Sequence, residues 1–151
     1  MKAILSNPYI TFCIRVFLGC VFIIASVEKI ASPEAFASSV EAYKLLPYSL
    51  INMFALVIPW LELLCGLFLA AGVASRASAG LLLGLLVIFI AGIVIAIFRG
   101  LNIDCGCFGP AHATPVGWMK VLEDCGLALL SMNIIRFPKS RYALEDIISQ
   151  I

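Results

Sequence analysis

Four long runs of apolar residues, separated by short polar stretches, dominate the pattern along the chain. They extend over about Tyr9 to Val27, Leu50 to Val73, Ala79 to Phe98 and Val116 to Phe137. A membrane-spanning helix needs roughly 20 predominantly apolar residues, and each run is close to that length. The pattern therefore predicts an all-α, polytopic membrane protein: one bundle of four transmembrane helices, forming a single domain over residues 1–151.

The segment between the first two runs is longer than a simple connector and has an apolar face of its own. Its apolar positions recur at helical spacing: Phe36, Val40, Tyr43 and Leu46. Pro33 after Ser32 is typical of a helix N-terminus, and Pro47 should end the helix. This segment therefore predicts a short helix lying at the membrane interface.

Composition supports a bilayer as the surroundings. The chain is 63% hydrophobic and 13% charged, whereas soluble domains carry about 25% charged residues. The net charge is only +1, and no cluster of lysine and arginine suggests a nucleic-acid partner.

The basic residues divide unevenly between the two ends of the expected bundle. One end has Lys2, Arg76, Arg136, Lys139 and Arg141, and the other has Lys29, Lys44 and Arg99. The positive-inside rule then places both termini in the cytoplasm and the loop between the third and fourth runs outside.

That outer loop contains the stretch that looks most like a chemical site, Asp104-Cys105-Gly106-Cys107-Phe108-Gly109-Pro110. Two cysteines one residue apart can form a disulfide only if the chain turns sharply, because an extended chain brings their Cα atoms near or past about 6.8 Å. Gly106 permits such a turn. Strained, exposed disulfides tend to be labile or catalytic, and an oxidising compartment preserves them, so the motif predicts redox chemistry.

Two other interpretations of the cysteine pair stay open. Cys105, Cys107 and His112 are possible ligands for Zn(II) or Cu(I), and the pair could instead form a static structural disulfide. The remaining cysteines lie inside the apolar runs: Cys13, Cys20, Cys65 and Cys125. Free cysteine is an ordinary core residue, although Cys20 and Cys125 are the better candidates for a redox relay.

Charged residues just after this loop are candidates for proton handling. Lys120, Glu123 and Asp124 are spaced to share one helical face, which should point into the bundle or toward the loop. The carboxylates could accept protons released when thiols are oxidised, and Lys120 could favour a reactive thiolate. The alternative is mutual neutralisation without a chemical role.

Two further charges lie within the first two runs. A charge near the bilayer centre costs about 2.5–3.5 kcal/mol on the insertion scale and needs a partner. We expect Arg15 and Glu62 to form an ion pair that fixes two helices, or else a polar element beneath a cofactor site.

The run Cys105-Gly106-Cys107-Phe108-Gly109 resembles the signature of the MauE branch of the DoxX-like membrane proteins. The resemblance extends to Arg15, Lys29, Pro59 and Glu62 and to the four-span layout. It implies a protein of the cell inner membrane, with the cysteine loop in the periplasm, that takes part in thiol–disulfide chemistry alongside a thioredoxin-like partner. The bundle of this family is similar to that of quinone-linked disulfide-forming enzymes.

We therefore expect a membrane thiol–disulfide oxidoreductase or electron relay, with Cys105 and Cys107 exchanging with the partner. The expected electron acceptor is a quinone as cofactor, held by Trp60, Glu62, Phe108 and Trp118, although tryptophans commonly lie at membrane interfaces for other reasons. The alternatives are a non-catalytic assembly or anchoring factor for a periplasmic redox protein, electron import through the buried cysteines, and a small transporter.

Overall fold

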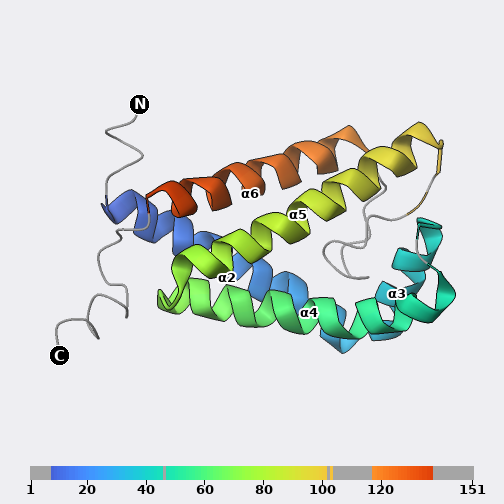
Figure 1. Ribbon diagram of the computed structural model, residues 1–151, viewed down its shortest axis with the longest axis horizontal. Helices are drawn as coiled ribbons and strands as arrows, with labels where there is room; N and C mark the ends of the chain where they lie inside the picture. Colours follow the sequence, from blue (N-terminus) through green and yellow to red (C-terminus); the bar gives the residue numbers. More distant parts are fainter. Residues whose placement is uncertain (1–7, 46, 102, 104–116, 138–151) are drawn as a thin grey trace.

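The computed structural model describes residues 8–45, 47–101, 103 and 117–137, and these residues form five helices and no strand (Figure 1). The helices are α2 (Pro8–Ala31), α3 (Pro33–Ala42), α4 (Tyr48–Ala71), α5 (Ser75–Phe98) and α6 (Trp118–Arg136). The protein is therefore all-α in its described part, as the apolar pattern predicts.

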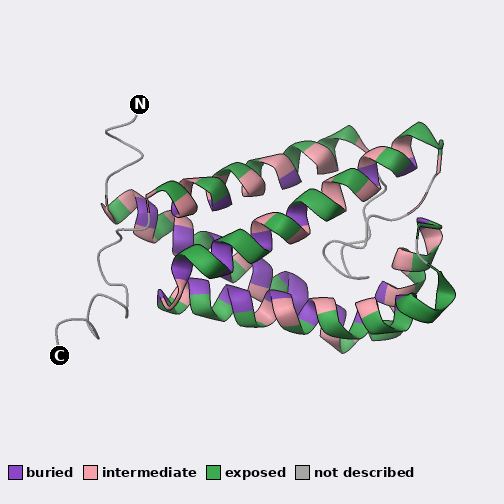
Figure 2. Cartoon of the chain, viewed as in Figure 1, coloured by how far each residue is buried: buried purple, intermediate pink, exposed green. Residues whose placement is uncertain are grey.

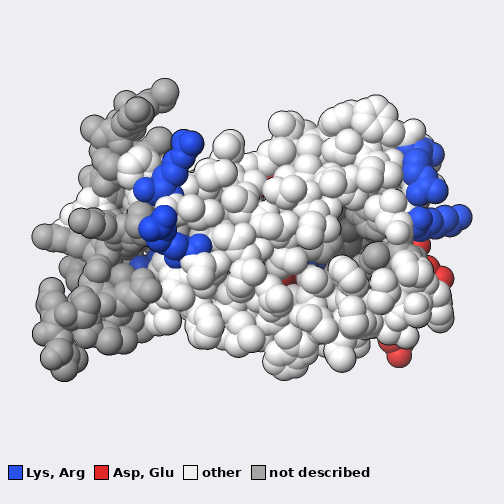
Figure 3. Space-filling view, viewed as in Figure 1, with Lys and Arg blue, Asp and Glu red and all other residues white. Residues whose placement is uncertain are grey.

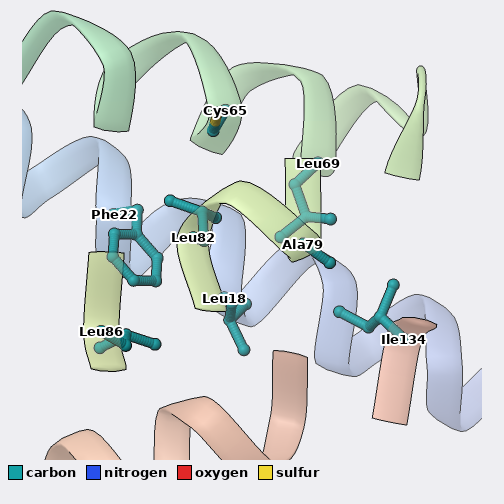
Figure 4. Close-up of a cluster of buried hydrophobic side chains, with 8 residues drawn as sticks. All are labelled: Leu18, Phe22, Cys65, Leu69, Ala79, Leu82, Leu86 and Ile134. Carbon is teal, nitrogen blue, oxygen red and sulfur yellow. The ribbon is translucent and has the colours of Figure 1, made fainter. Parts of the chain in front are cut away.

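The four long helices form two closely packed pairs. Helix α2 packs most extensively against α4, and α5 against α6. Each helix runs antiparallel to its partner, and α3 lies at the end of the bundle where α2 stops and α4 begins (Figure 1). A core of apolar side chains joins all four long helices: Leu18, Phe22, Cys65, Leu69, Ala79, Leu82, Leu86 and Ile134 (Figure 4).

Small residues allow α2 and α4 to approach closely. A Cβ atom added at Gly19 would lie 2.9 Å from the carbonyl oxygen of Gly66, and one added at Gly66 would lie 3.1 Å from the carbonyl oxygen of Gly19. Helices in membranes commonly pack through such small residues, because the lack of side chains lets the two backbones come together.

Three helices, α2, α4 and α5, are long and apolar enough to cross a membrane. Buried residues face the interior of the bundle (Figure 2). Many of the residues exposed on its outside have large apolar side chains. On the face shown in Figure 3, lysine and arginine gather at the two ends of the molecule. Helix α6 does not meet the same criterion, so the fourth crossing stays a prediction.

The helix boundaries differ from the apolar runs in two instructive places. Helix α2 continues to Ala31, beyond the expected end at Val27, and so places Lys29 inside the bundle. Helix α3 begins at Pro33, directly after Ser32, but ends at Ala42, well before Pro47. Lys44 takes a positive φ of 51°, which ends helical geometry. Whether α3 lies at the membrane interface stays a prediction.

Candidate functional site

A buried ion pair between α2 and α4 forms the centre of the site. The Lys29 Nζ donates to both carboxylate oxygens of Glu62, at 3.0 Å to Oε1 and 2.7 Å to Oε2, and each side chain is 2% exposed. The predicted pairing of Glu62 with Arg15 is therefore wrong. Arg15 lies a full 14 positions before Lys29, roughly 21 Å along the axis of α2, and its guanidinium lies over the Phe12 ring, 5.4 Å from the centroid.

Two aromatic rings complete the surroundings of the Lys29 ammonium. The Nζ atom lies 5.2 Å from the ring centroid of Phe36 on α3 and 5.2 Å from that of Phe89 on α5. A desolvated cation–π contact of this kind contributes about 2 kcal/mol. Lys29 therefore connects four helices, because Glu62 comes from α4 and Lys29 itself from α2.

A second carboxylate faces the ion pair from α6. Asp124 is 3% exposed, and its Oδ2 atom is buried without a hydrogen-bond partner among the described residues. It shares a small cavity of about 30 Å³ with Lys29 and Glu62, and its charge interacts with both of theirs. This volume is enough for a water molecule, which needs about 10–15 Å³. The cluster thus has one ammonium and two carboxyl groups in a low-dielectric interior.

A larger apolar cavity lies beside this charge cluster. It measures about 260 Å³ and is lined from three helices and the segment after α3: Phe36, Ser39, Val40, Tyr43, Leu45, Phe54, Ile58, Leu85, Ile88, Phe89 and Gly92. Phe36 and Phe89 are common to both features, because each also contacts Lys29. One layer of aromatic rings therefore separates the apolar cavity from the buried charges.

Tyr43 belongs to the wall of the apolar cavity and is influenced by the charge of Asp124. Its side chain lines the cavity and is 9% exposed. Burial, and secondly the negative charge of Asp124, raises the pKa of Tyr43 to about 12. The phenol therefore stays protonated at neutral pH and keeps its ability to donate a hydrogen bond.

The three charged residues at the start of α6 do not share one direction. Lys120 and Glu123 form an ion pair at 2.6 Å, in which the Lys120 side chain is 12% exposed and that of Glu123 is 55% exposed. Asp124 points into the bundle, as predicted, but Glu123 points outward. The reason is geometric, because successive residues in a helix are rotated by about 100°.

The predicted site residues Cys105, Cys107 and Phe108 lie outside the described residues, as does His112. The described residues next to this segment are informative. Ile103 and Val121, on either side of it in sequence, both pack against the apolar cluster of Tyr43, Ile93 and Ala96. The described residues nearest to the cysteine pair on either side in sequence therefore lie beside Tyr43.

Two other predicted site residues lie on the surface. Trp60 is 52% exposed and Trp118 is 59% exposed, and neither lines either cavity. The aromatic walls of the larger cavity come from Phe36, Phe54 and Phe89. Glu62 belongs to the charge cluster, and its role beside a cofactor stays a prediction. Phe89 lies in the most uniform apolar run, where nothing in the sequence distinguishes it from its neighbours as a residue of the site.

The four described cysteines are free. Cys13 and Cys20 are exposed on α2, Cys65 is buried in the core, and Cys125 is intermediate. Within the part of the chain that the structure describes, no group of three His, Cys, Asp or Glu side chains is arranged to hold a metal ion.

Comparison with known proteins gives a consistent result over most of the chain. The family model described as "Methylamine utilisation protein MauE" matches residues 7–136. Curated proteins named methylamine utilization protein MauE are similar: that of Methylorubrum extorquens is 37% identical over 89% of this chain and 73% of its own length. That of Paracoccus denitrificans is 31% identical over the same shares, and that of Methylophilus methylotrophus is 31% identical over 91% and 74%. No solved structure matches.

Proposed function

The chain belongs to the MauE family and is a multi-pass membrane protein, and from this we propose that it is a membrane thiol–disulfide oxidoreductase, or an electron relay, acting through Cys105 and Cys107. The relatives are named for methylamine utilisation, and we propose the same physiological setting here. The partner is a periplasmic thioredoxin-like protein, and the electron acceptor is a quinone of the membrane.

One observation carries this proposal. The residues that flank the cysteine segment, Ile103 and Val121, pack together with Tyr43, at the end of the bundle where Asp124 faces Lys29. Cys105 and Cys107 follow Ile103 by two and four positions in sequence. The described residues on both sides of the pair in sequence thus lie at the end of the bundle that contains the buried charge cluster and the apolar cavity. These features supply the parts needed to exchange electrons and protons at a membrane.

The proposed chemistry balances in two steps. A thiolate of the partner attacks the Cys105–Cys107 disulfide and forms a mixed disulfide, which the second partner thiol resolves. The partner then has a disulfide and the chain has two thiols. Quinone next accepts two electrons and two protons from these thiols, leaving as quinol and restoring the Cys105–Cys107 bond. Lys120 would favour the thiolate form, and the carboxyl groups of Glu123 and Asp124 would transfer protons.

The proposal includes an orientation in the cell inner membrane, with both termini in the cytoplasm and the cysteine segment in the periplasm. This requires α6 as a fourth crossing. Two features support it: α6 runs beside α5 in the opposite direction (Figure 1), and its 19 residues give a length of roughly 28 Å, close to the bilayer core. The side chains of Asp124 and Lys120 are largely shielded from the surroundings of the bundle. This shielding lowers the free-energy cost of placing their charges within a bilayer.

Cysteine substitutions in the full-length protein test the exchange step. We expect Cys105→Ser and Cys107→Ser each to abolish disulfide exchange with a thioredoxin-like protein, because the cycle needs both sulfurs. One of the two variants should accumulate a mixed disulfide, visible as a shifted band on a non-reducing gel, because the resolving thiol is missing.

The matched control is Cys13→Ser, which removes an exposed thiol from α2 and should exchange at the wild-type rate. Wild-type exchange by both Cys105→Ser and Cys107→Ser would refute the redox proposal. The alternative, a non-catalytic factor that anchors or assembles a periplasmic redox protein, would then account for the family membership.

A further inference from the structure

We propose that the apolar cavity between α3, α4 and α5 binds the ring of the membrane quinone, with the Tyr43 hydroxyl donating a hydrogen bond to a ring carbonyl. The inference rests on the proposed function and assigns the place of its electron acceptor. It differs from the sequence-based expectation, in which the quinone is held by Trp60, Glu62, Phe108 and Trp118.

The size and lining of the cavity suit a substituted six-membered ring. Its volume of about 260 Å³ exceeds that of an engineered cavity of about 150 Å³ that binds benzene. Aromatic rings from each of the three helices form its walls, namely Phe36, Phe54 and Phe89. Aromatic side chains favour flat ring systems in offset or edge-to-face arrangements. A saturated acyl chain would gain apolar burial there but has no ring to stack on these walls.

The cavity is accessible from the lipid side of the bundle. Two of its lining residues are also exposed on the outer surface, Ile88 at 64% and Leu45 at 46%. Ile88 belongs to α5, one of the helices able to cross a membrane. A quinone could therefore enter laterally and leave its isoprenoid tail among the lipids.

Polar groups beside the cavity suit the carbonyl oxygens of a quinone. Tyr43 lines the cavity and remains a protonated donor at neutral pH, since burial and the charge of Asp124 raise its pKa. The positive charge of Lys29 lies behind the rings of Phe36 and Phe89 and would favour an electron-rich group in the cavity. The hydroxyl of Ser39, which also lines the cavity, donates to the Ala35 carbonyl at 3.0 Å.

Gly92 offers a way to fill the cavity without disturbing the backbone. It lines the cavity, and a Cβ placed there would meet Leu45 and Tyr43 at an ordinary contact distance of 3.9 Å. Gly92→Leu should therefore occupy the ring site. The matched control is Gly84→Leu on the same helix, where an added Cβ has nothing within 4 Å.

The binding test uses purified full-length protein in detergent and a photoreactive azido-ubiquinone with a short tail. Wild type and Gly84→Leu should be labelled equally, while Gly92→Leu should lose at least about 90% of the labelling. Peptide mapping should find the label on α3 and α5 residues of the cavity wall. Tyr43→Phe should weaken competition by unlabelled ubiquinone-1 about 3- to 10-fold, as expected for loss of one hydrogen bond.

Several outcomes would overturn the inference. Equal labelling of Gly92→Leu and wild type, a label mapped elsewhere, or no specific labelling of the wild type would each exclude a quinone in this cavity. Displacement of phospholipid alone by Gly92→Leu would show an acyl chain to be the occupant. Disulfide exchange by Cys105 and Cys107, measured separately with a reduced thioredoxin-like protein, distinguishes these results from failure of the proposed function. Gly84→Leu, which lies outside the cavity, should retain that exchange.

Discussion

Glu62 is a carboxylate in the middle of an apolar helix, and the structure explains why it is tolerated. A single charge near the bilayer centre costs about 2.5–3.5 kcal/mol on the insertion scale. Lys29 neutralises it through two short hydrogen bonds, and the rings of Phe36 and Phe89 stabilise the ammonium in turn. Removing either side chain therefore leaves the other with a buried charge that has lost its hydrogen-bonding partner.

A double-mutant cycle measures this connection. Lys29→Met or Glu62→Gln alone should each lower the free energy of unfolding by about 3–5 kcal/mol, because each strands a buried charge. The double variant should lose clearly less than the sum. Unfolding by SDS in mixed micelles, followed by circular dichroism, gives the values.

The same cycle with Arg15→Met and Glu62→Gln is the control. Its effects should be additive within about 0.5 kcal/mol, because the two side chains do not form a pair. Additivity in the Lys29–Glu62 cycle, or coupling in the Arg15–Glu62 cycle, would contradict the pairing described here.

Sequence reasoning identified Glu62 as a buried charge needing a partner but chose the wrong one. The apolar run suggested that the first helix ends at Val27, which left Lys29 in the aqueous loop. In the structure α2 continues to Ala31, and the long side chain of Lys29 reaches Glu62. Hydropathy alone places Lys29 outside the bundle, because it does not take into account the ion pair with Glu62 that stabilises the buried ammonium.

At the scale of elements, the contact between α2 and α4 depends on two glycines. Gly19→Ala places a methyl group 2.9 Å from the Gly66 carbonyl oxygen and 3.0 Å from Ala70. Backbone must move, because a real Cβ essentially never approaches so closely. We expect a loss of about 1–3 kcal/mol in the free energy of unfolding, measured in the same SDS titration.

Gly80→Ala provides the comparison for this prediction. An added Cβ at Gly80 has nothing within 4 Å, so the change should be neutral or stabilise the helix by about 0.5–1 kcal/mol. Equal free energies of unfolding for Gly19→Ala and Gly80→Ala would contradict the close approach of α2 and α4.

The elements themselves were the most predictable part of the protein. Hydropathy identified α2, α4 and α5, and the Ser32-Pro33 step marked the start of α3. The end of α3 was not predictable from Pro47, because the helix ends earlier through the positive φ of Lys44. Periodicity also grouped Glu123 with Asp124, although their side chains point in different directions.

For the whole molecule, composition predicts the membrane, whereas the site depends on packing between distant segments. Residues from α2, α4 and α6 meet at the charge cluster, and α3, α4 and α5 meet at the apolar cavity. A sequence does not reveal which helices are neighbours, so Phe36 and Phe89 could not be paired beforehand. The Cys105/Cys107 motif, by contrast, was evident from the sequence alone.

Electron transfer in reconstituted vesicles tests the central claim most directly. Full-length protein is reconstituted with ubiquinone-1 and supplied externally with a reduced thioredoxin-like protein, and quinol formation is followed by absorbance. The redox account predicts steady quinone reduction by the wild type, and loss of that turnover in the Cys105→Ser/Cys107→Ser double variant, while Cys13→Ser stays active. Normal turnover by the double variant would contradict the account.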